Sequence, residues 1–363
     1  GKINTIKTFA QYFIEKGLLM VLPENSKKST MKEVAECARV SISTVSHVVN
    51  KTRHVDKETQ DRVLETIEKL NYAPNIFARG LRGKKIRIIG VIISDIRESF
   101  FAEVVKAIEL TAHSEGYSVI LCDSEDDPLK EQLHINTLIQ NGVEGLILAP
   151  VNNSTRVYDS VIPHKIKAIQ IDRKVYGLPA GFVGINNTEI TKKAMNHLFA
   201  HGFMNVGFVS YQTNVYTMEQ RLSGYKMAAQ LHNSSKKINV KFIQYNGSDN
   251  KEIIKSWLYQ NKEIDSILCG NDNICYQVLR AIRELQYEIP KDMGVLSFDD
   301  SKWFKLINPS ITAIRQPTNQ IGKLATEILI TEIQNKIENY SQKENHILNA
   351  ELIIRKSCRE SAD

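Results

Sequence analysis

Long apolar runs, cysteine pairs and nucleotide-binding loops are all missing from this 363-residue sequence. Apolar stretches such as residues 18–22 are far shorter than the ~20 residues that cross a bilayer, so we expect no membrane contact. The five cysteines form no C-x-x-C pair and have no histidine at metal-ligand spacing. This favours buried, reduced thiols in a cytoplasmic protein over disulfides or a metal site.

Signatures of catalysis are missing as well. No G-x-G-x-x-G or Walker loop follows an expected strand, and no carboxylate pair or nucleophile triad stands at useful spacing. We therefore expect no enzyme, no catalytic residue and no cofactor.

Positive charge is concentrated near the N-terminus. Residues 24–87 contain 14 Lys and Arg against 8 Asp and Glu, whereas residues 88–363 contain 30 against 32. This polarity suits a chain whose head meets a polyanion and whose body does not, although a solvated basic surface would carry the same charge.

Residues 1–29 are expected to be an extension, disordered or not native. Their apolar patch is interrupted by Glu15 and Lys16, and no small-residue cleavage site follows, which argues against a signal peptide. Because residues 15–17 must be encoded by a purine-rich stretch that resembles a ribosome-binding site, we hypothesise that translation starts at Met20 or Met31.

Three short helices are expected in residues 30–74. A capping box at residues 30–33 opens the first, Ser41 caps a second over residues 42–49, and Asp56 caps a third over residues 57–70. The tight turn between the first two is typical of a helix-turn-helix, while a plain helical miniature core would explain the apolar positions equally well. Those positions are Val34, Ala35, Ala38, Val45, Val48, Val49, Val63, Ile67 and Leu70.

A dense set of motifs runs through this segment and just beyond it. They are Met31-Lys32-Glu33-Val34-Ala35, Val40-Ser41, Thr44-Val45-Ser46, Asn50, Val55, Thr59, Arg62-Val63, Leu70-x-Tyr72-x-Pro74-Asn75 and Ala78-Arg79-Gly80-Leu81. Together they resemble the DNA-binding head of the lactose-repressor (LacI/GalR) family of bacterial transcription factors.

The resemblance implies that the second helix reads base edges in the major groove of double-stranded operator DNA. The base-reading candidates are Ile42, Ser43 and His47, with Arg53 in the following loop. Phosphate contacts, which set register without reading sequence, are expected from Thr44, Ser46, Asn50 and Lys51.

Residues 75–85 are expected to be a hinge helix and linker. Residues 75–81 make barely two helical turns, too few for a helix that is stable alone. The resemblance implies that the hinge folds when two chains meet over the operator and that Leu81 enters the minor groove, although an ordinary linker role for Leu81 stays open. The further DNA-contacting candidates are Asn75, Ala78 and Arg82, with Lys84 and Lys85 near phosphates.

From residue 86 onward short apolar strands alternate with amphipathic helices, which predicts doubly wound α/β sheets in two lobes. The expected lobes cover about 86–187 plus 317–345, and 188–316 plus 346–363. Strands are expected at 86–93, 118–122, 145–148, 168–171, 205–209, 241–245, 266–269 and 294–298. Helices are expected at 102–115, 128–141, 189–200, 218–231, 251–260, 275–285 and 320–335.

Further motifs in residues 86–363 resemble the periplasmic-binding-protein-like sensor of the same family. They are Phe100-Phe101-Ala102-Glu103, Gly116-Tyr117, Gly145, Asp172-Arg173, Arg221-Leu222-x-Gly224-Tyr225, Asn271-Asp272, Ile289-Pro290-x-Asp292, Ser297-Phe298-Asp299-Asp300 and Gln316-Pro317. Ligands of such sheets bind beyond the carboxyl ends of the strands.

The resemblance implies an effector between the lobes, with Phe100 and Phe101 stacking on its ring. Arg221 and Asp299 are the strongest expected polar ligands. The secondary candidates, each of which has an alternative role in packing the lobes or capping a loop, are Asp172, Arg173, Thr217, Asn271 and Trp303.

Two features bear on the class of effector. Glu98-Ser99 precede the aromatic pair where sugar-specific members often carry Asn-Pro, which argues against a simple pentose. The run from Trp303 to Thr312 is weakly similar to family members that respond to pectin-derived sugar acids.

We expect a homodimer that represses transcription from a palindromic operator under the control of a sugar or sugar acid. Induction, corepression and control by a phosphoprotein partner all stay open, because the family includes each of them. The alternative is a solute-binding or sugar-binding protein with no role at DNA, and the dense motifs of the head argue against it.

Overall fold

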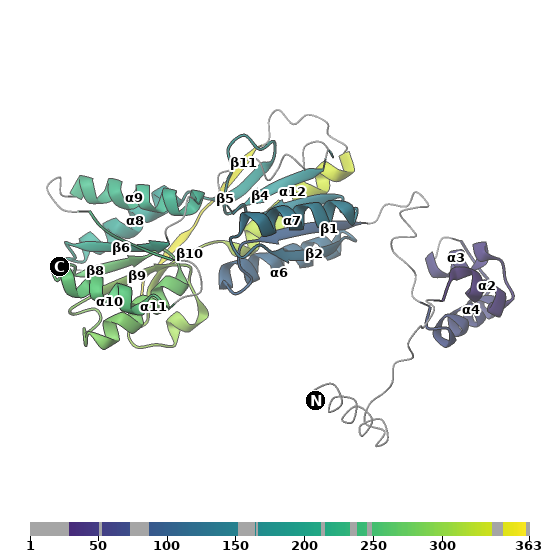
Figure 1. The fold of residues 1–363 in the computed structure, drawn as a ribbon, viewed down its shortest axis with the longest axis horizontal. Helices are drawn as coiled ribbons and strands as arrows, with labels where there is room; N and C mark the ends of the chain where they lie inside the picture. The colour runs from purple at the N-terminus through teal and green to yellow at the C-terminus, as the bar shows by residue number, and fades with distance from the viewer. Residues whose placement is uncertain are drawn as a thin grey trace, which may run out of the picture. The chain divides into compact units, whose positions relative to one another are not determined.

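The computed structural model describes residues 29–50, 53–72, 87–151, 164, 166–211, 215–232, 238–244, 249–335 and 344–360. The chain divides into two compact units, residues 1–85 and 86–363 (Figure 1). In these described ranges no helix is both long and apolar enough to span a membrane. Residues 1–28 and the expected hinge lie outside the described residues.

The first unit contains three helices in its described part: α2 (Met31–Ala38), α3 (Ile42–Asn50) and α4 (Lys57–Lys69). The predicted capping box of α2 is confirmed, since Thr30 Oγ1 accepts from the backbone N–H of Glu33 at 3.3 Å and Glu33 Oε2 accepts from that of Thr30 at 2.7 Å. Arg39 turns the chain into α3 with a φ of 53°. Asp56 Oδ1 caps α4 by accepting from the N–H of Thr59 at 2.9 Å.

The core of the head is formed by the apolar faces predicted from the sequence, with Val34, Val45 and Val63 fully buried. Thr66 joins this core unexpectedly. Its hydroxyl donates to the carbonyl of Arg62 at 2.8 Å, so its polar atom is satisfied within the helix. Cys37 is exposed on α2, contrary to the expectation that each thiol is buried.

In the described residues of the second unit, lobe 1 has a six-stranded sheet in the order β11-β5-β4-β3-β1-β2, and all its neighbouring strands run parallel. Nearly continuous apolar runs such as that of β1 are typical of parallel strands buried on both faces. The strands are β1 (Ile88–Ile93), β2 (Ser118–Asp123), β3 (Gly145–Leu148), β4 (Lys167–Ile171), β5 (Gly181–Ile185) and β11 (Asn345–Leu348).

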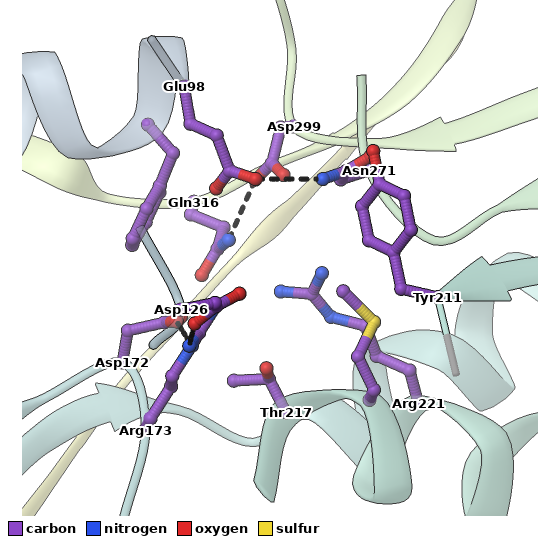
Figure 2. Close-up of a pocket in the computed structure, with 12 residues that line it drawn as sticks. Glu98, Asp126, Asp172, Arg173, Tyr211, Thr217, Arg221, Asn271, Asp299 and Gln316 are labelled. Carbon is purple, nitrogen blue, oxygen red and sulfur yellow. Dashed lines mark hydrogen bonds and ion pairs between the residues drawn. The ribbon is translucent and has the colours of Figure 1, made fainter. Parts of the chain in front are cut away.

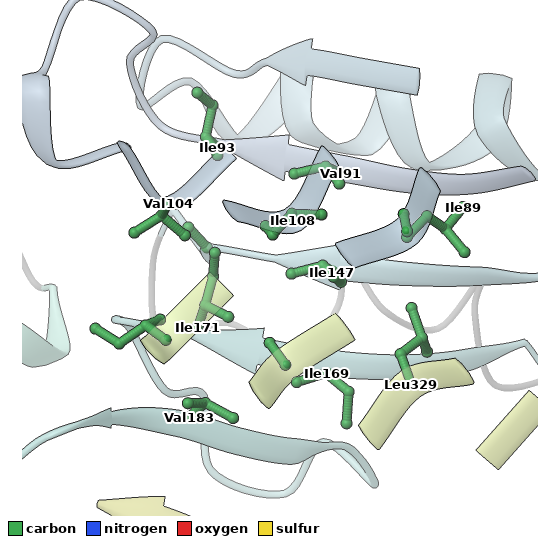
Figure 3. Close-up of a cluster of buried hydrophobic side chains, with 14 of the residues drawn as sticks. Ile89, Val91, Ile93, Val104, Ile108, Ile147, Ile169, Ile171, Val183 and Leu329 are labelled. Carbon is green, nitrogen blue, oxygen red and sulfur yellow. The ribbon is translucent and has the colours of Figure 1, made fainter. Parts of the chain in front are cut away.

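Helices cover both faces of this sheet. Alternate residues of β1 pack against α6 (Ser99–Ser114) and α12 (Thr318–Asn335) on one face (Figure 3) and against α7 (Pro128–Gln140) on the other. The two helices on the first face approach closely at Gly322, where an added Cβ would lie 2.5 Å from the carbonyl oxygen of Val104.

Lobe 2 repeats the plan, with a six-stranded sheet in its described residues in the order β12-β10-β9-β8-β6-β7. Neighbouring strands are parallel except that β12 is antiparallel to β10. The strands are β6 (Val206–Tyr211), β7 (Asn239–Ile243), β8 (Ser266–Cys269), β9 (Gly294–Phe298), β10 (Thr312–Arg315) and β12 (Glu351–Ile353).

On one face of this sheet lie α10 (Lys251–Gln260) and α11 (Asp272–Glu284), near the short 3-10 helix η2 (Lys302–Lys305). The other face packs against α8 (Asn187–Ala200) and α9 (Tyr216–His232). Gly224 of α9 permits their close approach, because an added Cβ would lie 2.5 Å from the carbonyl oxygen of Thr188.

The two lobes share one strand order, so β1 to β5 correspond to β6 to β10. In the described residues the chain passes between the lobes after β5, after β10 and after β11. Because β11 belongs to the sheet of lobe 1, that lobe extends past the expected boundary at residue 345. The predicted two-lobed, doubly wound α/β fold is confirmed.

Candidate functional site

The outward face of α3 is the candidate DNA-reading surface of the head. Ser41 Oγ accepts from the backbone N–H of Thr44 at 3.1 Å and caps the helix, as predicted. Val45 and Val48 turn into the core, while Ile42 remains 43% exposed at the first turn. An apolar side chain in that position suits contact with a thymine methyl group.

The other predicted DNA contacts in the described head reach solvent to different extents. Ser43 and Arg53 are exposed, whereas Thr44, Ser46 and His47 are half-buried. The predicted contacts that lie outside the described residues are the side chain of Asn50 and residues Lys51, Asn75, Ala78, Leu81, Arg82, Lys84 and Lys85.

A cavity lies between the strand-end loops of the two lobes (Figure 2). Its volume is about 20 Å³, room for a water molecule rather than a sugar. An adjoining pocket of about 200 Å³ shares Phe100, Asp299 and Gln316 with this cavity, so a ligand of sugar size needs more room than the cavity alone offers. The lining residues are Glu98, Phe100, Asp126, Asp172, Arg173, Tyr211, Thr217, Met218, Arg221, Asn271, Asp299 and Gln316.

Lobe 1 contributes a buried ion-pair cluster directly after β4. The Arg173 guanidinium donates to both carboxylate oxygens of Asp126, and its Nε lies 3.8 Å from Asp172 Oδ2. Burial lowers the pKa of Arg173, but the Asp126 carboxylate more than compensates and raises that pKa above its usual range. Arg173 is therefore a charged group that is already paired.

Lobe 2 contributes Arg221 from α9, and the rest of the lobe holds its guanidinium in place. Its Nε donates to Asn187 Oδ1 at 2.8 Å and its Nη1 donates to the carbonyl of Gly270 at 2.7 Å. The guanidinium also lies 4.0 Å from the centre of the Phe298 ring. Figure 2 shows it directed into the cavity, where it can meet oxygens of a ligand.

Two aspartates face the cavity from corresponding positions of the lobes. Asp172 follows β4 with a φ of 58°, and Asp299 follows β9 with a φ of 64°. Left-handed backbone is tolerated by aspartate better than by most residues and often occurs at functional sites. Burial raises the pKa of Asp299 to about 7 despite the opposing charge of Arg221, and repulsion from Asp272 adds to the rise.

The N-termini of α6 and α11 meet across the cavity. Asn271 Nδ2 donates to Glu98 Oε1 at 3.2 Å, and Ser99 Oγ donates to Asp272 Oδ2 at 2.9 Å. Burial raises the pKa of Glu98 well above its usual range, and Arg173 offsets this only in part. These contacts hold the lobes together in the closed state.

Two predicted effector ligands do not reach the cavity. Phe101 is 1% exposed in the lobe 1 core, edge-to-face with Phe100, so only Phe100 lines the cavity. Consecutive helical residues point about 100° apart, and α6 already begins at Ser99, so both rings cannot face one ligand. Trp303 instead packs edge-on against Phe304, 4.5 Å between ring centres.

Five lining residues were not predicted as ligands: Glu98, which was noted only for its charge, and Asp126, Tyr211, Met218 and Gln316. Gln316 follows β10, a strand that was not expected, and Tyr211 ends β6 beyond its expected end at residue 209. Met218 stands one turn before Arg221 on α9, a spacing that could have revealed it. Asp126 lies in the loop after β2, where strand-end position was the available signal.

Metal binding has no support in the described part of the chain, where no group of His, Cys, Asp and Glu side chains could hold an ion. The fold and its two sites define a class of protein: a helix-turn-helix head followed by a two-lobed domain that encloses a small polar cavity.

Comparison with known proteins identifies the family. The model for bacterial regulatory proteins of the lacI family matches residues 30–75, and the periplasmic binding protein-like domain matches residues 195–358. The chain belongs to the LacI family and is a DNA-binding transcriptional regulator rather than an enzyme.

Relatives of known name resemble nearly the whole chain. The probable HTH-type transcriptional regulator EndR of Paenibacillus polymyxa is 32% identical over 319 residues, 86% of this chain and 93% of that protein. The HTH-type transcriptional regulator KdgR of Bacillus subtilis (strain 168) is 32% identical over 336 residues, covering 91% and 97%.

Among solved structures, the Lac repressor dimer bound to operator and the anti-inducer ONPF matches with a TM-score of 0.78 and 25% identity. The match covers 92% of this chain and 100% of that one. The predicted family and fold are confirmed, and the alternative of a solute-binding protein without a DNA role is excluded.

Proposed function

We propose that the protein is a repressor that binds a palindromic operator as a homodimer and responds to a sugar or sugar acid held between the two lobes. The observation that carries this proposal is the cavity, whose lining is shared by both lobes. A ligand that replaces the bond from Asn271 to Glu98 changes how the lobes are held. A ligand that binds more tightly to one arrangement of the lobes than to another shifts the protein toward that arrangement. The resulting coupling free energy between the ligand site and a distant DNA site is typically about 1–3 kcal/mol.

The proposed domains are a head at 30–74, a hinge and linker at 75–85, and a sensor at 86–363. In the head, Ile42, Ser43 and His47 would read bases with Arg53, and in the hinge Leu81 would enter the minor groove. The remaining proposed DNA contacts, which fix the position of the protein on the duplex, are Thr44, Ser46, Asn50, Lys51, Asn75, Ala78 and Arg82. The proposed location is the cytoplasm.

The proposed dimer face lies along the edge strands β2 and β7, one in each lobe. Beside β2, Leu110 of α6 is 53% exposed, and Phe242 of β7 is 45% exposed. Edge strands with exposed apolar neighbours favour association with a second copy, and a two-fold dimer matches a palindromic site. Sedimentation of a Leu110→Glu variant is expected to show a shift toward monomer.

The operator can be found by incubating the full-length protein with fragmented genomic DNA at moderate salt and sequencing the retained fragments. A shared palindrome with a flexible central step is the expected result. Sugars and sugar acids suggested by the neighbouring genes are then added, and a change in operator affinity identifies the effector. Absence of enrichment, both alone and with those metabolites, would overturn the proposal.

A pair of variants separates sequence reading from general attraction to DNA. His47→Ala is expected to relax sequence preference within the palindrome, because imidazole donors match purine acceptors in the major groove. Lys69→Ala serves as the control, since this exposed lysine of α4 pairs with Glu65 and is not a proposed contact. Equal loss of preference in both variants would count against the assignment of α3.

A further inference from the structure

On one side of the cavity, two side-chain amides each donate a hydrogen bond within the protein. Asn271 Nδ2 donates to Glu98 Oε1 at 3.2 Å, and Gln316 Nε2 donates to Asp299 Oδ1 at 2.7 Å. Figure 2 draws these two hydrogen bonds as dashed lines. Each amide therefore keeps at most one N–H for an acceptor of a ligand.

Acceptors at the same place are in surplus. The hydrogen bonds found in the described residues use one oxygen of each carboxylate, which leaves Oε2 of Glu98 and Oδ2 of Asp299 for a ligand. Gln316 is 5% exposed, and its Oε1 is buried with no hydrogen-bond partner in the described part of the chain. Since buried acceptors without donors are costly, the site favours a ligand that brings donors.

The charge of these carboxyl groups is only partly compensated, through the nearby Arg173 and Arg221. In the described residues, Glu98, Asp299 and the neighbouring Asp272 make no ion pair within salt-bridge distance, while Arg173 is paired elsewhere and Arg221 is held by neutral acceptors. Burial raises the pKa of both cavity carboxyls, and repulsion from neighbouring aspartates adds to the rise. A positive group placed between them would stabilise their ionised forms.

We propose that the effector is a polyhydroxylated amine, such as an amino sugar, whose ammonium group lies between Glu98 and Asp299 and donates to Gln316 Oε1. This inference rests on the proposed function, in which the cavity holds the effector. An ammonium group has three donors and one positive charge, which match three acceptors and offset buried negative charge. Phe100 offers an apolar face to the ring, and Arg221 faces the hydroxyl groups.

Neutral sugars and sugar acids fit this site less well. A neutral sugar donates hydroxyl hydrogens to the acceptors but brings no positive charge to stabilise the ionised forms of Glu98 and Asp299. A sugar acid adds a negative charge to the cavity, and among its described lining residues only Arg221 is a cation that is not already in an ion pair. The amine is therefore the functional group that distinguishes the expected ligand.

The test uses matched rings that differ in one substituent, titrated into the full-length protein by calorimetry. For the gluco, galacto and manno series, the 2-amino sugar is compared with the parent hexose, the uronic acid and the N-acetylated amine. In the series that binds, the amine is expected to bind about tenfold or more tightly than its parent, since charge-assisted bonds are about twice as strong as neutral ones. N-acetylation, which removes the charge, is expected to abolish this advantage.

A matched pair of variants assigns the effect to the cavity. Glu98→Gln is expected to lose the preference for the amine, whereas Glu115→Gln, at an exposed position of lobe 1, is expected to retain it. Tighter binding of a neutral sugar or uronic acid than of its amine overturns the inference and leaves the proposed sugar sensor intact. If no member of any series binds or alters operator affinity, both the amine and the sugar class are wrong.

Discussion

Asp299→Asn tests the electrostatics of the cavity without adding bulk. Asparagine tolerates the left-handed backbone at this position, and its carbonyl oxygen can still accept from Gln316. The folded protein raises the pKa of Asp299 from 3.8 to about 7, so this group contributes stability that is present below pH 4 and lost as the pH rises through 7. The asparagine variant does not titrate at this position, so it does not lose this stability as the pH rises.

The size of the effect follows from proton linkage. With a pKa of 3.8 when unfolded and about 7 when folded, Asp299 lowers the free energy of unfolding by about 3 kcal/mol between pH 5 and pH 8. His197 acts in the opposite direction, because burial and the neighbouring His201 lower its pKa to about 4. The informative quantity is therefore the difference between wild type and variant at each pH.

Urea denaturation followed by tryptophan fluorescence reports the unfolding of lobe 2, which contains Asp299, because Trp257 and Trp303 both pack against the lobe 2 core. The variant is expected to gain stability relative to wild type as the pH rises from 5 to 8. The control Glu351→Gln, at an exposed position of β12, is expected to follow wild type. Parallel curves for Asp299→Asn and wild type would refute the reasoning.

Three further changes test packing, pairing and capping. Gly224→Ala sets a Cβ 2.5 Å from the carbonyl oxygen of Thr188, so about 1–3 kcal/mol of unfolding free energy is expected to be lost, and an unchanged urea midpoint would argue against the close approach of α8 and α9. Asp126→Asn leaves the buried Arg173 without its main ion-pair partner and is expected to cost about 3 kcal/mol in the same assay, unless another carboxylate replaces it. Ser41→Ala removes the cap of α3, and a loss of about 1 kcal/mol in thermal unfolding of the head, with weaker operator binding, is expected; retention of both would contradict the capping role.

Long amphipathic elements were predictable from the sequence because their period repeats enough times to be distinct. The short strands β5, β10, β11 and β12 were not expected. β10 (Thr312–Arg315) and β12 (Glu351–Ile353) mix polar and apolar residues over a few positions, so they lack the nearly continuous apolar run that revealed the equally short β3 and β8. Such strands are specified by the neighbour they pair with, and this information lies elsewhere in the chain.

The candidate site divides in the same way. Side chains that directly follow long strands, such as Asp172 and Asp299, were predicted, because the carboxyl ends of parallel strands mark the ligand edge. Gln316 follows a strand too short to predict, and the aromatic pair was assigned from the family motif without regard to the helix that carries it. In both cases the missing information was the local direction of the backbone.

Correspondence between the lobes explains why the cavity is acidic on one side. Each lobe places an aspartate in left-handed backbone after its fourth strand, so the two carboxylates converge from opposite sheets. In lobe 1 the next residue is Arg173, which with Asp126 completes a paired cluster. In lobe 2 the next residue is Asp300, which pairs with Arg315 and Arg355 instead of facing the cavity. Asp299, unlike Asp300, thus has no ion-pair partner within salt-bridge distance in the described residues, and the positive group of an effector is expected to lie beside it, between the lobes.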